Sequence, residues 1–528
     1  MAIAGRLACV ALLLVLGACA SGSRVGGPPQ ESVLPRALPE TEGVSSLGLL
    51  EFLDASEERE LGLHSLMIVK DGHVITEAWW EPYRPEDRHT LYSLSKSFTS
   101  TAVGLAIEEG FLGLDDRVVD YFDDELPDEV GANLGAMTVR DLLSMSTGHD
   151  EDALAGLGLG VLDGEEDWAA MALSQPVPHE PGTHFLYNNA APYLLSAMVQ
   201  KRTGQTLMEF LTPRLFEPLG IEGADWEVSP QGIVTGRSGL RLRTEDIAKF
   251  GLLYLNRGKW GGKRLLPAWW VDATTSAQVA TGDPDSTEGW PDWSQGYGYF
   301  FWRCRYGAYR GDGAFGQFCI VLPEEDAVIV MTAENSEMQR TMDAVWEFLL
   351  PALRGERSGD LMATETLLAR QQGLSLTLGE RLWDKDNVGP DVTGRVYEME
   401  PNELGIETVS YIFEGDGWAE VVVTDARGEH RVACGIGEWE RGETTLSPAP
   451  LFLVTTGTTL GETERVAGIG GWVWDRVFHM RWQFVETGHH DKVYTRFEGD
   501  RVWIRFTRSL AGMGEHTDDR PDLVGTAR

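Results

Sequence analysis

Ser93 and Lys96 stand three residues apart at the start of a segment whose pattern predicts a helix over residues 93–109. The large apolar residues Phe98, Val103 and Ile107 suit a packed central helix. Because residues i and i+3 lie on one helix face, we expect the Lys96 amine within reach of the Ser93 hydroxyl. A serine becomes a good nucleophile when a neighbouring base takes its proton, so the pair predicts covalent acyl transfer. The alternative is an ordinary exposed lysine in a chance S-x-x-K.

A second group of candidate residues is Tyr187-Asn188-Asn189, where a loop meets a predicted helix over residues 189–203. A phenol and an amide at such a junction can enter a cleft beside the serine and lysine. The plainer interpretation of Tyr187 is a half-buried structural tyrosine, which is the commoner fate of this residue type.

Several segments, in consistent order across residues 40–350, resemble the serine β-lactamase and penicillin-binding protein superfamily, in its class C, esterase-like branch. The segments are 91–99, 112–116, 137–148, 181–189, 216–220, 244–251 and 316–324. The resemblance implies an α+β fold with an antiparallel sheet flanked by helices. The predicted strands at both ends of this region, with helices between them, favour the same architecture.

The resemblance also implies a role for each candidate. Ser93 would attack an ester or amide carbonyl, and Tyr187 would take its proton with help from Lys96. Phenol and ammonium groups ordinarily titrate at about 10, so the pair must share charge in a desolvated cleft, and which group is the base stays open. Asn189 would hold substrate polar groups or orient Lys96. Backbone N–H groups of Ser93 and Ala314 would bind the oxyanion, with no cofactor and no metal.

The chain departs from the family at its third motif, which is usually Lys-Thr-Gly or His-x-Gly. Alignment back from Gly316 places Gly311-Asp312-Gly313 there, with Arg310 just before it. Arg310 is our candidate for the missing substrate-binding cation, because a guanidinium binds carboxylates in a fork. The alternative is a solvated turn residue.

These features predict an exported serine hydrolase that acts on a small-molecule ester or amide. The rival activities within the family are a D-amino-acid peptidase or amidase and a weak β-lactamase. The rival from another class is a non-catalytic sensor or binding lipoprotein of the cell envelope, for which the altered third motif is the one indication.

The composition excludes one class of partner. The 528 residues carry a formal net charge of −38, with acidic residues dispersed along the chain. Nucleic acid is an improbable ligand, since binding phosphates requires a basic face.

The N-terminus predicts export. Residues 1–18 combine Arg6 with a short apolar run, which is typical of a signal peptide and too short to span a bilayer. Leu16-Gly17-Ala18-Cys19 resembles a lipoprotein motif, so we expect lipidation of Cys19, a flexible linker over residues 19–42, and a location in the periplasm or cell envelope on a membrane. The alternative is cleavage at Ala18-Cys19-Ala20, which would release a soluble exported protein.

The pattern along the chain predicts two folded domains. Residues 43–354 form the expected hydrolase domain, with a hairpin over 63–80, further helices over 206–216, 245–256 and 338–350, and strands over 297–305, 315–322 and 327–333. A connector over 355–389 leads to short strands and turns over 390–510, which predict an all-β barrel or sandwich domain, and residues 511–528 are expected to be a disordered tail. The β domain is either a structural appendage or shapes access to the site.

Cysteines and histidines add little. Cys304 and Cys319 fall on neighbouring predicted strands, so a disulfide and two buried thiols are both open. Without C-x-x-C spacing we expect no zinc site. His489-His490 is interpreted as a pair of solvated loop histidines.

Overall fold

The computed structural model describes residues 33–154, 167–285, 289–356, 361–378, 389–415, 417–446, 463–509, 518 and 520–528. Residues Leu34–Arg528 form one compact unit. The predicted signal peptide and Cys19 lie outside the described residues. Within the described part, no helix is long and apolar enough to cross a membrane.

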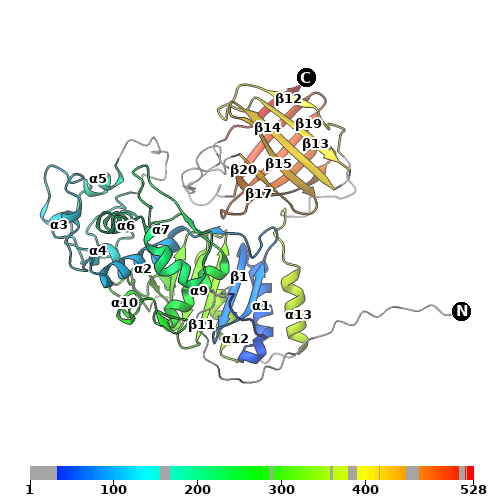
Figure 1. The fold of residues 1–528 in the computed structure, drawn as a ribbon. Helices are drawn as coiled ribbons and strands as arrows, with labels where there is room; N and C mark the ends of the chain where they lie inside the picture. Colours follow the sequence, from blue (N-terminus) through cyan, green and yellow to red (C-terminus); the bar gives the residue numbers. More distant parts are fainter. Residues whose placement is uncertain are drawn as a thin grey trace, which may run out of the picture. The chain divides into compact units, whose positions relative to one another are not determined.

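A six-stranded antiparallel sheet forms the centre of the hydrolase domain, with strand order β2-β1-β11-β10-β9-β8 (Figure 1). Its strands are β1 (Leu63–Lys70), β2 (His73–Trp79), β8 (Trp302–Arg303), β9 (Tyr309–Gly313), β10 (Gln317–Leu322) and β11 (Ala327–Ala333). Strands from the two ends of the domain are therefore neighbours: β1 pairs with β11, as in Ile68 opposite Ile329.

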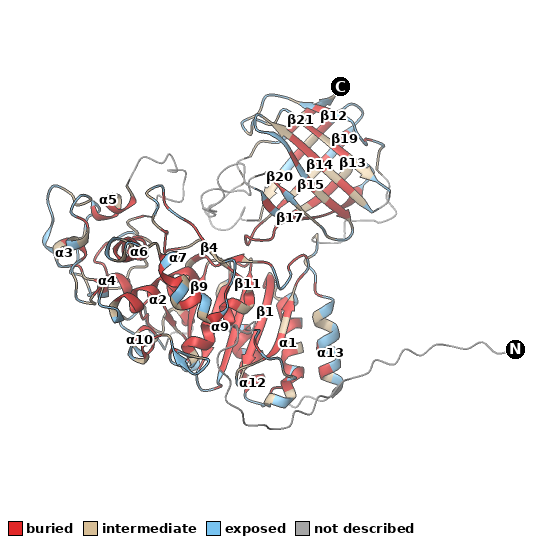
Figure 2. Ribbon diagram, in the orientation of Figure 1, coloured by how far each residue is buried: buried red, intermediate tan, exposed pale blue. Residues whose placement is uncertain are grey.

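The sheet is apolar on both faces, and alternate residues contribute to different cores. One core includes Met67, Val69, Val321, Val328 and Val330. The other includes Leu66, Ile68, Ile320, Ile329 and Met331. Helix α9 (Thr244–Leu255) contributes Ile247 and Phe250 to the first core, and α1 (Ser46–Glu58) contributes Phe52 and Leu53 to the second. The sheet is thus sandwiched between helices, and its inner strands are buried along nearly their whole length (Figure 2).

The helical region surrounds α2 (Ser95–Glu108), which is buried along nearly its whole length. The remaining helices are α3 (Ala132–Ala136), α4 (Val139–Leu143), α5 (Trp168–Leu173), α6 (Ala190–Thr203), α7 (Leu207–Leu211), α8 (Glu217–Leu219), α10 (Ala268–Thr274), α11 (Met338–Ala344), α12 (Leu350–Leu353) and α13 (Leu361–Gln372). Short strands β3 (His89–Thr90), β4 (Asp225–Trp226) and β5 (Leu240–Leu242) form a small sheet, and β6 (Lys259–Trp260) pairs with β7 (Lys263–Arg264).

Most predicted elements are confirmed, including the 63–80 hairpin with its Asp71-Gly72 turn. The strand expected over 297–305 is mostly wrong, because only Trp302–Arg303 joins the sheet. The segment before it bonds to the helical region instead, with Tyr299 N donating to the Thr274 carbonyl and Phe300 N to the Leu143 carbonyl.

The C-terminal domain is a closed barrel, which is one of the two forms that the sequence predicts. Its neighbouring strands in the described part of the chain are antiparallel except for one pair. Its strands are β12 (Val396–Met399), β13 (Thr408–Glu414), β14 (Trp418–Asp425), β15 (Gly428–Ile436), β16 (Glu440–Thr444), β17 (Glu464–Trp474), β18 (Val477–Phe484), β19 (His490–Glu498), β20 (Arg501–Arg508) and β21 (Leu523–Ala527). A parallel pairing of β15 with β17 closes the ring, and β16 lies outside it against β17. Aromatic side chains such as Tyr411, Trp472 and Phe497 fill the interior.

Two predicted boundaries are corrected. Residues 511–528 are not wholly a disordered tail, because Leu523–Ala527 pairs with both β12 and β20, and Leu523 is 1% exposed. The expected linker over 19–42 also ends earlier. Leu34 is buried, and the Arg36 guanidinium pairs with the carboxylates of Glu77 and Glu245, so the chain is docked from residue 34 onward.

Candidate active site

Ser93 lies in a short 3₁₀ turn, Tyr92–Leu94, directly before α2. Lys96 follows in the first turn of that helix, so the i,i+3 spacing places its amine over the serine, as predicted. The Lys96 Nζ lies 2.7 Å from Ser93 Oγ and donates a 2.8 Å hydrogen bond to the Arg237 carbonyl. Lys96 is 1% exposed, whereas Ser93 is half-buried. Ser93 is thus the more exposed residue of the pair.

The charges around Lys96 alter its titration. Burial, and then the charge of Arg237, lower the pKa of the Lys96 amine to about 7. The carboxylates of Asp152 and Asp312 act in the opposite direction. Near neutral pH a large fraction of this amine is therefore unprotonated and able to accept a proton.

Tyr187 joins this pair from the loop before α6. The Ser93 side chain lies near enough to the Tyr187 phenol to act against the rise in pKa that burial causes, and the Lys96 Nζ lies 4.9 Å from the centre of the tyrosine ring. Burial raises the pKa of the Tyr187 phenol, and the charge of Asp312 raises it further. The ring stacks on Trp302, with centroids 5.9 Å apart. The structure brings the three predicted side chains together.

Asn189 has a different partner from the one we expected. Its Nδ2 donates a 2.6 Å hydrogen bond to Asp152 Oδ2, and its backbone N–H donates to the other oxygen of the same carboxylate. Asn189 therefore holds Asp152, whose charge acts on Lys96, rather than bonding to the lysine directly.

Ala314 lies in the turn between β9 and β10, beside the serine turn. A Cβ at Gly313 would lie 2.0 Å from the Leu91 carbonyl, so only glycine permits this approach. At Gly311 a Cβ would lie 2.4 Å from Leu94 Cδ1 and 2.5 Å from Ser97 Oγ. The third-motif strand thus packs against the serine turn, and its first position has no room for a side chain.

Arg310 is neither a substrate-binding cation nor a solvated turn residue. It is fully buried within β9, where its Nε donates 3.0 Å to Asp312 Oδ2 and its Nη1 donates 2.8 Å to the Asp292 carbonyl. The guanidinium also lies 4.1 Å from the Trp293 ring centre. Because strand alternation and ion pairing turn this cation into the core, it is a structural residue rather than a substrate-binding one.

Burial decides the state of the cysteines and of the His489-His490 pair. Cys304, Cys319 and Cys434 are all free and buried. His489 and His490 are not solvated: they are buried or nearly so, and both bond to Glu334. Their burial depends on contacts with residues more than 150 positions away, for which the local pattern carries no signal.

Arg237 and Asp152 are the site residues that sequence reasoning missed. Neither lies in a motif, and both are far from Lys96 in the sequence. Each acts on the Lys96 amine through its charge. A loop arginine or aspartate is ordinarily interpreted as a surface residue, so the sequence offers no signal for them.

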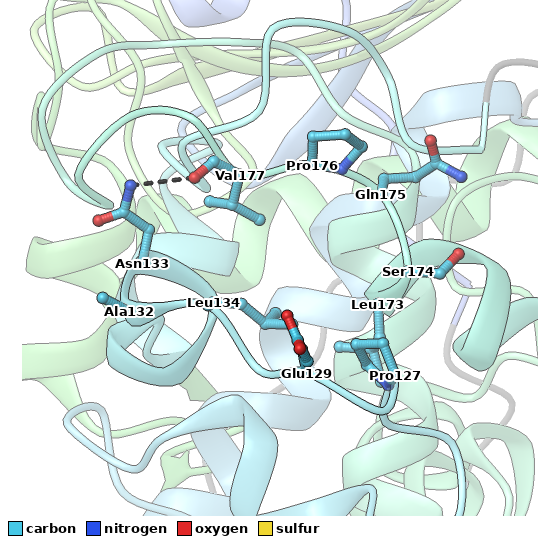
Figure 3. A pocket seen from close by; sticks show the side chains of 11 residues that line it. Pro127, Glu129, Ala132, Asn133, Leu134, Leu173, Ser174, Gln175, Pro176 and Val177 are labelled. Carbon is cyan, nitrogen blue, oxygen red and sulfur yellow. Dashed lines mark hydrogen bonds between the residues drawn. The ribbon is translucent and has the colours of Figure 1, made fainter.

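A separate pocket of about 300 Å³ lies in the helical region (Figure 3). Its lining comes from residues 127–134 and 173–177, and the Asn133 side chain donates across it to the Val177 carbonyl. None of Ser93, Lys96 or Tyr187 lines this pocket, so it is not the site described above.

The fold and the Ser-Lys-Tyr cluster together define a class, the serine hydrolases of the β-lactamase and penicillin-binding type. Residues 55–352, more than half of the chain, match the family model described as Beta-lactamase. The chain therefore belongs to the β-lactamase family and is a serine hydrolase.

Two relatives agree with this assignment, and a solved structure agrees with the fold. The chain is 25% identical to a 6-aminohexanoate-dimer hydrolase of Paenarthrobacter ureafaciens over 50% of this chain and 71% of that protein. It is 30% identical to a D-aminopeptidase of Brucella anthropi, over 30% of this chain and 31% of that protein. A solved structure from Bacillus anthracis, assigned as a 6-aminohexanoate-dimer hydrolase, has a TM-score of 0.51 at 23% identity, covering 62% of this chain and 89% of that one. This last likeness concerns the fold alone.

Proposed function

We propose that the protein cleaves an ester or amide through an acyl-enzyme on Ser93. The observation that carries this proposal is the 2.7 Å contact of Ser93 Oγ with a buried amine whose pKa is lowered to about 7. A neutral amine can donate one N–H to the Arg237 carbonyl and still accept the serine proton with its lone pair.

The two perturbed pKa values favour Lys96 as the base. At neutral pH the Tyr187 phenol is protonated, because its pKa is raised. In acylation the Ser93 proton moves to Lys96 as the oxygen–carbonyl bond forms. The Tyr187 hydroxyl then gives its proton to the leaving group as the scissile bond breaks and takes the proton from Lys96, which leaves both side chains neutral. Water then attacks the acyl-enzyme, gives its proton to Lys96, and restores Ser93. The backbone N–H groups of Ser93 and Ala314 are the proposed oxyanion donors.

The strand at the third-motif position, residues 311–313, favours substrates that place no carboxylate beside it. Gly311 presents no side chain, Asp312 is an acid, and the Arg310 cation is buried in its pair with Asp312. A β-lactam or another carboxylate-bearing substrate would gain no charge-assisted bond from this strand. The names of the relatives, an amide hydrolase and an aminopeptidase, support amide substrates.

An active-site label and a substrate panel test the proposal. A fluorophosphonate probe should add once to the wild type, at Ser93, and not to Ser93→Ala. Nitrophenyl esters and D-amino-acid anilides should be hydrolysed faster than a chromogenic cephalosporin. Equal labelling of both proteins would place the nucleophile elsewhere, and an inert wild type would favour a non-catalytic sensor of the cell envelope.

We also propose that the chain is exported and lipid-anchored through Cys19, on the strength of its N-terminal sequence. Cells expressing the full chain should incorporate a labelled fatty acid into the wild type and not into Cys19→Ala. A mature N-terminus beyond residue 20 without lipid would support the soluble exported form instead.

A further inference from the structure

The loop between β18 and β19, residues 485–489, contacts the segment that leads into Ser93. The Thr90 N–H donates a 3.0 Å hydrogen bond to the Glu486 carbonyl. A Cβ on Gly488 would lie 3.7 Å from the His89 ring and 4.0 Å from the Tyr92 ring. The C-terminal barrel therefore reaches the turn of the nucleophile through this loop.

His489 is the residue of this loop that meets both parts of the proposed oxyanion hole. Its Nε2 hydrogen-bonds to the Tyr92 hydroxyl, and Tyr92 directly precedes Ser93. Its ring also packs edge-on against Phe315, with centroids 5.0 Å apart, and Phe315 directly follows Ala314. Tyr92 and Phe315 pack edge-on against each other at 5.2 Å, so the three rings form one cluster.

Tyr92 and Phe315 both have strained backbones. Their φ angles are 46° and 67°, in the left-handed region that residues with a Cβ seldom adopt. Such a conformation is energetically unfavourable and persists only where the surroundings impose it. Each strained residue adjoins one proposed oxyanion donor, so a relaxation of either would turn an N–H away from the reacting carbonyl.

His489 is itself held firmly. It is 1% exposed, its Nδ1 lies 2.8 Å from Glu334 Oε1, and its carbonyl accepts a 3.0 Å hydrogen bond from Gln483. The other oxygen of Glu334 lies 2.7 Å from His490 Nδ1. Although burial raises the pKa of Glu334, the two histidines hold it well below its usual value, so the carboxylate stays charged beneath the cluster.

We propose that His489 is a positioning residue for the oxyanion hole, supplied to the hydrolase domain by the barrel. It fixes Tyr92 and Phe315 in their strained conformations and thereby aims the backbone N–H groups of Ser93 and Ala314 at one point. The barrel is then a part of the active-site scaffold and not an appendage. This inference rests on the proposed function, because it assigns those two N–H groups to the oxyanion.

Steady-state kinetics on the full chain test the role. His489→Ala should lower kcat about ten- to a hundredfold with KM changed less than about threefold, since only the transition state carries the oxyanion. The affinity for a boronic acid, whose adduct with Ser93 is tetrahedral, should fall by a similar factor. His489→Gln, which can still bond to the Tyr92 hydroxyl, should recover part of both losses.

His490→Ala is the matched control, because His490, the first residue of β19, bonds to the other oxygen of Glu334 but, within the described part of the chain, makes no hydrogen bond or ring contact with Tyr92 or Phe315. It should keep kcat and boronate affinity near wild type. Equal losses in His489→Ala and His490→Ala would overturn the inference in favour of a general structural effect. Wild-type kcat in His489→Ala would overturn it while leaving the proposed function intact.

Hydrogen exchange supplies a readout that does not depend on turnover. Peptides covering residues 91–94 and 313–316 should exchange faster in His489→Ala than in His490→Ala or the wild type. If Ser93 is never acylated, the proposed function fails, and this exchange difference still decides whether His489 holds the two strained segments. Unchanged exchange in both peptides would overturn the positioning role.

Discussion

At the scale of single residues, the site is a buried amine surrounded by fixed charges. Arg237 supplies Lys96 with a carbonyl acceptor and, through its guanidinium, with a positive field. Asp152, held by Asn189, and Asp312 oppose that field. The balance leaves the amine close to half-protonated at neutral pH, which is where a general base is most effective.

The pH dependence follows from this balance. Lys96 accepts a proton only when it is neutral, so kcat/KM should rise with pH through about 7 and then level off. Arg237→Met removes a cation that disfavours the ammonium, so the pKa of Lys96 should rise and the acidic limb should move to higher pH. Arg237→Lys, which keeps the charge, is the control. If the acidic limb of the kcat/KM profile does not move in Arg237→Met, a group other than Lys96 controls it.

At the scale of elements, α2 carries Lys96, directly follows the turn of the nucleophile, and depends on close packing along its buried length. A Cβ at Gly104 would lie 2.3 Å from the indole of Trp270, which belongs to α10 and is fully buried. Glycine at this position lets the two helices approach, and α2 has no exposed side toward which it can shift.

Gly104→Ala should therefore destabilise the protein, despite the higher helix propensity of alanine. Overpacking of this kind costs about 1–3 kcal/mol in the free energy of unfolding, measured by urea titration. Gly135→Ala in α3 is the matched control. The Cβ there would meet only the Val130 side chain, at 3.6 Å. That change should stabilise by less than about 1 kcal/mol. Equal effects at both positions would contradict the packing argument.

At the scale of the whole molecule, buried charges join the hydrolase domain to the barrel. The Arg441 guanidinium of β16 bonds to both oxygens of Asp87, whose side chain is 2% exposed, and to the Pro82 carbonyl. Arg88 likewise pairs with Glu486 of the barrel loop. The Arg88 pair holds the loop that carries His489, and the Arg441 pair holds β16, so the two domains should unfold as one unit.

Arg441→Met tests this coupling. Breaking a buried pair leaves an uncompensated charge, so the free energy of unfolding should fall by about 3 kcal/mol, and calorimetry should resolve two transitions in place of one. Arg431→Met, which removes an exposed pair with Glu420 and Glu429 on the barrel surface, should change stability by less than about 1 kcal/mol. A single unshifted transition in Arg441→Met would mean that apolar contacts couple the domains.

The sequence alone determined what short-range geometry dictates. Helix periodicity places Lys96 on Ser93 because i and i+3 always share a face, and short apolar runs bounded by turn residues mark strands such as β1 and β11. Only the tertiary structure decided the rest. Burial turned Arg310 into a core ion pair and brought His489 beneath the nucleophile's turn, 397 positions from Tyr92. Such contacts depend on how elements pack in three dimensions, and neither spacing nor composition records that arrangement.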